Sequence, residues 1–231
     1  MIQPLVAIST VQDGNMYIPG DTENADVIEN RIRWLNSNNV AMGNATRLSI
    51  TYDGDNFCRY RTLNEDDKGD GMVSNGSAPA DALVVTSPGH ALFLPVADCV
   101  ATVLFDAEHS VLMLAHLGRH SLEQQGGAAA VNYLRQNFNT NPAELSVWLS
   151  PAPSPEFYPI FALENKGMKQ SLYEQLAKAG IKTDAIYDSV IDTDTDQNYY
   201  SHSAFLQGMK PTDGRFAMVA MMVEDSEKSA S

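Results

Sequence analysis

Two apolar runs separated by a short polar segment constrain the fold of this chain more than any other feature. The runs are Val100–Phe105 and Val111–Ala115, and the segment between them is Asp106–His109. Apolar runs of this length that flank a short turn are typical of two buried strands. The sequence therefore predicts an antiparallel β-hairpin at this place in the chain.

The hairpin would bring a cysteine and a histidine together. With a symmetric loop of two or four residues centred on Asp106–His109, Cys99 stands directly opposite His116, with Cβ atoms about 4.5–5.5 Å apart. A three-residue loop would shift the register by one and place the two on opposite faces. Such a pair suits two ligands of one metal ion, or a thiol with an imidazole base. The alternative is a small core cysteine and a histidine that is merely hydrogen-bonded.

The residues after the hairpin favour a functional role. Gly118 lets the backbone approach closely, and Arg119 and His120 add hydrogen-bond donors. Ser121 and Gln124 form a capping-box pattern, which predicts a helix that begins near Ser121. The free N–H groups of a helix start favour an anion such as phosphate. The alternative is that Arg119 and His120 lie on a solvated turn.

The pattern along the rest of the chain predicts the fold class. Helical spacing appears over Ala25–Asn36, after Ser121, and from Met168 towards Gly180, which is a suitable stop. The strand-like runs are Leu83–Thr86, Ala91–Val96, Val100–Phe105, Val111–Ala115, Ser146–Leu149 and Phe216–Val223. Because strands and helices alternate irregularly, we expect an α/β (α+β) mixed-sheet sandwich rather than a doubly wound parallel sheet. The whole chain, 1–231, is expected to be a single domain with a frayed tail over 224–231.

Composition argues against two classes of partner. Fifteen basic and 29 acidic residues give a formal net charge of −14, which disfavours binding to nucleic acid or to an anionic membrane surface. The longest stretch without charged residues, Ala82–Ala97, is too short and too polar to span a bilayer. Two cysteines cannot build a disulfide framework, so we expect a reducing, cytoplasmic environment.

Three motifs resemble those of the laccase-domain or polyphenol-oxidase (YfiH-like) family. They are Ala80–Thr86, Ala97-Asp98-Cys99 and His116-Leu117-Gly118, which match that family's "ADAL-V-T" strand, "ADC" strand and "H-x-G" turn. The resemblance extends to Asn30-Arg31, 148–152 and 213–216. It implies a mixed α/β fold and a zinc ion bound by one cysteine and two histidines. Despite the copper-oxidase name, it also implies phosphorolysis, and in part deamination, of purine nucleosides.

Carried over residue by residue, the resemblance makes Cys99 and His116 two of the zinc ligands. The family's other histidine lies in a "Q-V-H-G" motif, where this chain has Thr51-Tyr52-Asp53-Gly54, so Asp53 becomes the expected third ligand. Copper is an expected substitute for zinc. Several family arginines are missing, which leaves Arg119 and Arg59 as nearby replacements for binding phosphate.

These arguments lead to a zinc enzyme that acts on purine nucleosides and phosphate. Its expected catalytic residues are Cys99, His116, Arg119 and His120. Two alternatives stay open: a metal-free cysteine hydrolase in which His116 activates Cys99, and a catalytically degenerate binding protein that keeps only the fold.

Overall fold

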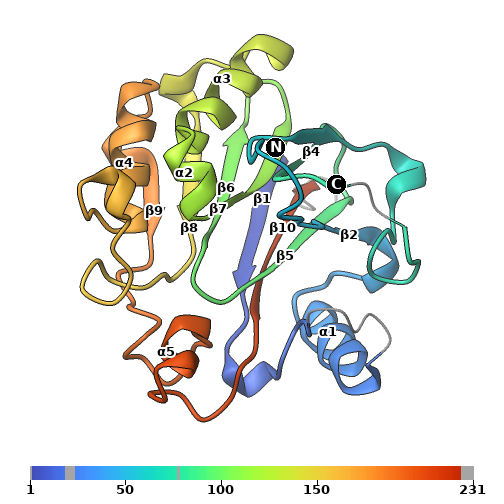
Figure 1. Ribbon diagram of the computed structural model, residues 1–231. Helices are drawn as coiled ribbons and strands as arrows, with labels where there is room; N and C mark the ends of the chain where they lie inside the picture. The colour runs from blue at the N-terminus through green and yellow to red at the C-terminus, as the bar shows by residue number, and fades with distance from the viewer. Residues whose placement is uncertain (1, 19–23, 77–78, 225–231) are drawn as a thin grey trace.

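The structure is a computed structural model that describes residues 2–18, 24–76 and 79–224 (Figure 1). The expected frayed tail lies outside these residues, apart from Glu224, which ends the last strand. None of the helices in the described ranges has the length and apolarity needed to cross a bilayer.

Within the described residues, ten strands form two mixed sheets. The four-stranded sheet has the order β1 (Ile2–Ile8), β10 (Phe216–Glu224), β5 (Ala91–Val96) and β2 (Ala45–Arg47). The six-stranded sheet has the order β3 (Tyr60–Thr62), β4 (Ala82–Val85), β7 (Val111–Leu117), β6 (Val100–Asp106), β8 (Ser146–Leu149) and β9 (Ile186–Asp188). The β2–β5, β3–β4 and β8–β9 pairs are parallel, and the other pairs are antiparallel.

Helices cover the outer faces of both sheets (Figure 1). The six-stranded sheet packs against α2 (Arg119–Glu123), α3 (Gly126–Phe138) and α4 (Met168–Lys178), and the four-stranded sheet against α1 (Ala25–Ser37). A short helix, α5 (His202–Leu206), precedes β10. Single 3₁₀ turns lie at Val11–Asp13, Met42–Asn44, Glu65–Asp67, Pro142–Glu144, Phe161–Leu163 and Thr183–Ala185.

The two-residue period of β7 explains how these layers hold together. Val111, Met113 and Ala115 belong to the cluster under the helices, whereas Leu112 and Leu114 belong to the cluster between the two sheets. Successive side chains of a strand point to opposite faces, so both faces of β7 are buried. His116 follows in the register of Leu112 and Leu114 and therefore faces the second sheet.

The expected mixed α/β sandwich is confirmed, and the long elements lie where the sequence placed them. β5 and β8 have the predicted bounds, and α1 and α4 cover the predicted helical segments. Sequence analysis missed β1, β2, β3 and β9, which are the edge strands of the two sheets. Three of them have only three residues, and β1 contains Pro4, so they carry little strand pattern of their own.

The predicted hairpin forms, but its register differs from the expected one. Ala101, rather than Cys99, stands opposite His116, because the four-residue loop is 107–110 with Ser110 at φ 55°. The direct pairing of Cys99 with His116 is therefore wrong. Cys99 nevertheless lies two residues before Ala101, which puts it on the same face as His116.

A helix does begin near Ser121, but the predicted capping box of Ser121 and Gln124 is wrong. Helix α2 begins at Arg119 after Gly118, and Ser121 is buried inside it. Gln124 does not complete a capping box, because its amide accepts from the Phe57 N–H and donates to the Asp55 carbonyl, at 2.9 and 2.6 Å.

We expect the inter-sheet core to dominate stability. Leu114→Ala should lower the free energy of unfolding by about 2–5 kcal/mol, because Leu114 is fully buried between the sheets. Leu206→Ala is the matched control: this side chain is 70% exposed, and its truncation should cost no more than about 0.5 kcal/mol. Urea denaturation of both variants measures the difference. Equal losses would show that the sheet interface is not the core that the packing indicates.

Candidate functional site

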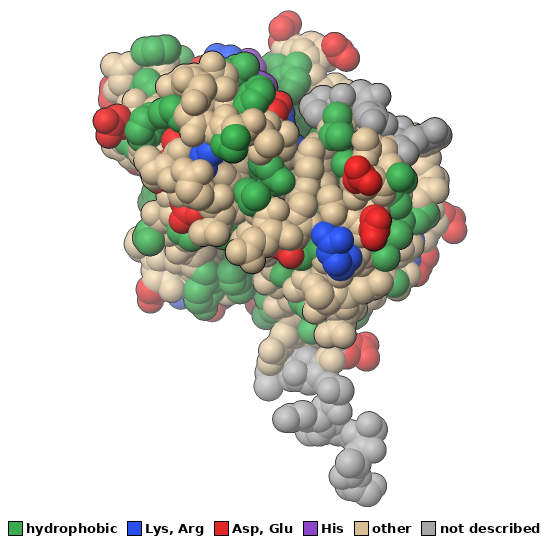
Figure 2. Space-filling model, turned by 90° about the horizontal axis from the view of Figure 1, so that it is seen from below, with side chains coloured by type: hydrophobic (Ala, Val, Ile, Leu, Met, Phe, Trp, Pro, Cys, Tyr) green, Lys and Arg blue, Asp and Glu red, His purple; other side chains and the backbone are tan. Residues whose placement is uncertain are grey.

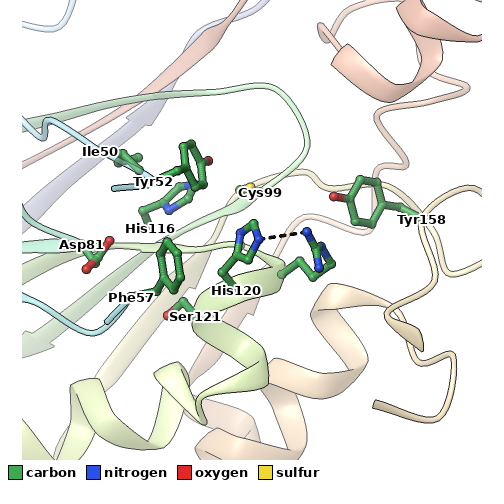
Figure 3. Close-up of a pocket in the computed structure, with 11 residues that line it drawn as sticks. Ile50, Tyr52, Phe57, Asp81, Cys99, His116, His120, Ser121 and Tyr158 are labelled. Carbon is green, nitrogen blue, oxygen red and sulfur yellow. Dashed lines mark hydrogen bonds between the residues drawn. The ribbon is translucent and has the colours of Figure 1, made fainter. Parts of the chain in front are cut away.

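Cys99 and His116 lie where two cavities meet. Figure 3 shows both residues among those that line the smaller cavity. The small cavity, of about 130 Å³, is lined in addition by Arg119, His120 and Asp81. The large cavity, of about 540 Å³, extends towards Arg47 and α5. The residues common to both walls are Ile50, Tyr52, Cys99, His116 and Tyr158. The two cavities therefore share the predicted cysteine and histidine.

Gly118 allows the thiol and the imidazole to approach each other. A Cβ atom at Gly118 would lie 2.6 Å from Cys99 Sγ and 3.1 Å from His116 Cε1. Its φ of −94° is ordinary, so the position requires glycine for space and not for backbone conformation. Cys99 Sγ and His116 Cε1 thus both lie against Gly118 in spite of the shifted register, and the two residues are called the pair below.

Burial keeps both members of the pair neutral. It raises the pKa of the Cys99 thiol to about 12, with a further contribution from the carboxylate of Asp98. It lowers the pKa of His116 to about 4, only partly offset by Asp81. A cysteine nucleophile needs a depressed thiol pKa, so this environment does not favour the cysteine-hydrolase alternative.

Asp81 is the buried carboxylate beside the pair, but both of its oxygens are already engaged. Arg59 donates from Nε to Oδ2 at 2.7 Å and from Nη2 to Oδ1 at 2.9 Å. The Asp81 backbone carbonyl accepts from the His116 N–H at 2.8 Å. Arg59, which the sequence offered as a phosphate ligand, therefore holds the carboxylate of the ADAL strand in place.

Arg119 and His120 line the small cavity together with Cys99 and His116. Arg119 Nη2 donates to His120 Nε2 at 2.9 Å, since a guanidinium has no acceptor (Figure 3). Phe57 stacks on the imidazole of His120 at 4.7 Å between ring centroids, and Tyr52 lies 5.6 Å away. The imidazole is thus held between an aromatic loop and a cation that faces the small cavity.

The structure does not bring Asp53 together with Cys99 and His116. Asp53 is exposed in the loop beside Tyr52 and lines neither cavity. Over the described ranges, no three His, Cys, Asp or Glu side chains converge as a metal group. A thiol and an imidazole are suitable zinc donors, but a stable site needs at least three protein ligands. These residues do not fit the expected three-ligand zinc site.

The large cavity contains residues that sequence analysis did not select. Asp98, next to Cys99, accepts from Ser201 Oγ at 2.7 Å and from the Ser203 N–H at 2.9 Å, which ties the start of β6 to α5. Arg215 belongs to one of the resembling motifs, so a signal for it existed. Tyr52, Tyr158 and Arg47 carry no local signal, because only the folded chain places them at the cavity.

Comparison with known proteins identifies the family. The model of the multi-copper polyphenol oxidoreductase laccase family matches residues 9–170. The chain belongs to this family. The match spans both the ADC strand and the H-x-G turn, so the resemblance inferred from these motifs is confirmed.

Individual relatives agree with this assignment. A purine nucleoside phosphorylase of Xylella fastidiosa is 28% identical over 165 residues, which is 61% of this chain. The chain spans about 60% of the length of that relative. The crystal structures of Bacillus licheniformis YfiH and Geobacillus stearothermophilus YlmD superpose with TM-scores of 0.80 and 0.83, each at 19% identity. They cover 95% and 96% of this chain, and 92% of each neighbour is covered, which shows a shared fold.

The close approach at Gly118 is testable. Gly118→Ala should lower the free energy of unfolding by about 1–3 kcal/mol, because the added methyl group overlaps Cys99 Sγ. Gly43→Ala is the control, since a Cβ there meets no atom within 4 Å and should change stability by no more than about 1 kcal/mol. Guanidinium titrations compare the two variants. A Gly118→Ala protein as stable as the parent would mean that the pair is looser than described.

A second prediction concerns the exposed aspartate. Asp53→Ala should leave zinc affinity unchanged in competition with a chromogenic chelator, because Asp53 is not grouped with Cys99 and His116. Cys99→Ala is the comparison that removes a thiol donor and should weaken whatever binding the parent shows. A tenfold loss of affinity in Asp53→Ala would restore Asp53 as a ligand.

Proposed function

We propose that this protein cleaves purine nucleosides by phosphorolysis, with Cys99, His116, Arg119 and His120 at the reaction centre. The observation that carries the proposal is the pair of adjoining cavities that meet at Cys99 and His116. Phosphorolysis needs a site for a small anion next to a site for a nucleoside. The relative from Xylella fastidiosa, which carries the name purine nucleoside phosphorylase, supports the same reaction class.

The small cavity suits inorganic phosphate. Its basic side chain, Arg119, is 42% exposed; it donates to His120 at 2.9 Å and makes a long contact of 3.4 Å with Glu123. A guanidinium carries five N–H donors, so donors remain for an anion. Arginine binds phosphate through two parallel N–H···O bonds. His120 accepts from Arg119 and is itself stacked on Phe57, which fixes the direction of the guanidinium.

The large cavity suits the nucleoside. Its volume lies within the range of about 300–1,000 Å³ found for small-molecule sites. Leu48, Ile50 and Val96 supply apolar walls, Tyr52 and Tyr158 supply aromatic faces, and Ser203 supplies a polar group. Apolar walls with a few placed polar groups match a flat base joined to a hydroxylated sugar.

The reaction follows from this arrangement. A phosphate oxygen held by Arg119 attacks C1′ of the ribose, while the bond between C1′ and the purine nitrogen breaks. The electron pair of that bond leaves with the purine, whose nitrogen takes up the proton that the attacking hydrogen phosphate loses; the products are the free base and ribose 1-phosphate. Holding the anion and the nucleoside in two cavities that adjoin at Cys99 and His116 supplies the proximity that the bimolecular reaction otherwise lacks.

The donor set favours this reaction over the zinc and copper alternatives. Zinc and copper remain cofactors implied by family membership, but Asp53 does not converge with Cys99 and His116 to complete a three-ligand site for either ion. Deamination by a zinc-activated water would need such a site. Multicopper oxidation needs many histidines. Three of the five here bond elsewhere: His90 to Thr46, His109 to Asp106 and His202 to Asp213.

The test is phosphate-dependent release of base from inosine. Arg119→Met should lower kcat/KM for phosphate about 10- to 100-fold, which corresponds to the loss of one charge-assisted contact of about 1.5–3 kcal/mol. Arg135→Met, an exposed arginine of α3, is the matched control and should behave as the parent does. Chromatography of the released base measures both. A parent protein that releases no base, or releases it equally without phosphate, would contradict the proposal.

A further inference from the structure

Two buried arginines next to the large cavity have no acidic partner in the described ranges. They are Arg31 of α1 and Arg47 at the end of β2, with exposed fractions of 2% and 8%. Burial and, next, the positive charge of Arg47 lower the pKa of Arg31 to about 10. The two guanidinium groups therefore repel each other. Arg47 lines the cavity, whereas Arg31 does not.

The hydrogen bonds of these arginines do not balance their charges. Arg31 donates from Nε to the Met16 carbonyl at 2.7 Å, and its Nη2 is buried without a partner. Arg47 donates from Nε to the Gly71 carbonyl at 2.8 Å, and this is the only hydrogen bond that its side chain makes to the described residues. Buried charges are ordinarily paired, and an unsatisfied buried group calls for an ion or a water.

Aromatic rings orient both guanidinium groups, but they do not neutralise the positive charges. Arg31 Cζ lies 5.8 Å from the centroid of Phe93, and Arg47 Cζ lies 4.9 Å from that of Tyr17. A cation–π contact supplies about 0.5–2 kcal/mol and leaves the positive charge in place. Arg59, by comparison, is neutralised by Asp81 at 2.7 Å.

A third arginine, Arg215, lies near Met16, whose carbonyl accepts a hydrogen bond from Arg31. The Met16 N–H donates to the Arg215 carbonyl at 2.9 Å, and the Arg215 N–H donates to Asn15 Oδ1 at 2.8 Å. Arg215 also lines the large cavity. The Arg215 guanidinium is itself paired with Asp213 at 2.7 Å, so the positive charge without an acidic partner in the described ranges at this wall is that of Arg31 and Arg47. In a chain of net charge −14, whose acidic side chains are spread over the face seen in Figure 2, that charge favours an anion at this wall.

The position of Arg47 separates it from the small cavity. The large cavity is walled successively by Arg47, Leu48, Ser49 and Ile50, and of these only Ile50 also lines the small cavity. Three residues of extended chain span at most about 11 Å, so Arg47 lies within about 11 Å of Ile50, which lines both cavities. An anion at Arg47 is therefore distinct from one at Arg119, and Arg47 and Cys99 both line the large cavity.

We propose that Arg47, with Arg31 next to it, forms a second phosphate-binding subsite in the large cavity. The ligand is a phosphate group, supplied either as the 5′-phosphate of a nucleotide or as inorganic phosphate. The Nη groups of Arg47, which make no hydrogen bond to any of the residues that the structure describes, supply the donors, and the charge of Arg31 strengthens the local field. The proposal rests on the proposed function only in taking this cavity as the nucleoside site.

Calorimetric titration without turnover tests the subsite with three probes: inosine 5′-monophosphate, inosine and inorganic phosphate. Arg47→Met should weaken binding of the nucleotide about 10- to 100-fold and leave that of inosine unchanged. Arg33→Met is the matched control: this exposed arginine lies on α1 two residues from Arg31, and its loss should change none of the three affinities. Arg47→Lys keeps the charge and guards against a variant that fails to fold, and it should bind the nucleotide more tightly than Arg47→Met.

The outcomes separate the two sources of phosphate and the two proposals. Dependence on Arg47 for the nucleotide alone supports the subsite and identifies an esterified phosphate; the same dependence for inorganic phosphate supports it and identifies the free ion. Nucleotide and phosphate affinities that are unchanged in folded Arg47→Met and Arg47→Lys overturn the subsite. Because the readout is binding, failure of phosphorolysis would leave this result intact, and failure of the subsite would leave phosphorolysis intact.

Discussion

Burial of the β6–β7 hairpin on both faces is the constraint on which the rest of the molecule depends. One face packs against α2, α3 and α4, and the other packs against the four-stranded sheet. A strand buried on both sides tolerates few polar residues, so functional groups collect where the hairpin ends. Cys99 stands just before β6, and His116 stands one residue before the end of β7. The core thus determines where the site lies.

Burial at that end also determines the chemistry of the site. The same low-polarity surroundings that raise the pKa of Cys99 lower that of His116, which leaves a neutral pair rather than a reactive ion pair. The nearby carboxylate of Asp81 is held by Arg59 and is not free to serve as a ligand. Charge available to a substrate comes from the basic side chains around the pair, chiefly Arg119 in the small cavity and Arg47 in the large one.

The errors of sequence analysis have particular physical causes. The predicted hairpin loop, 106–109, begins one residue too early, because Ser110 adopts a positive φ that no local sequence pattern indicates. Ser121 and Gln124 have the residue types of a capping box, but the amide of Gln124 bonds instead to the distant loop that carries Phe57. Asp53 was aligned with a ligand position by its place in a motif, and the loop turns it towards solvent.

What the sequence determined by itself was local: the hairpin, the long helices, the mixed α/β class, and the motifs that placed Cys99, His116, Arg119 and His120 in one region. Apolar periodicity and short motifs encode such features within a few neighbouring residues. Only the tertiary structure decided the pairing of the edge strands, the division into two cavities, and the meeting of Arg31 with Arg47. These depend on contacts between segments far apart in the chain, whose geometry arises from packing of the whole fold and has no local signature.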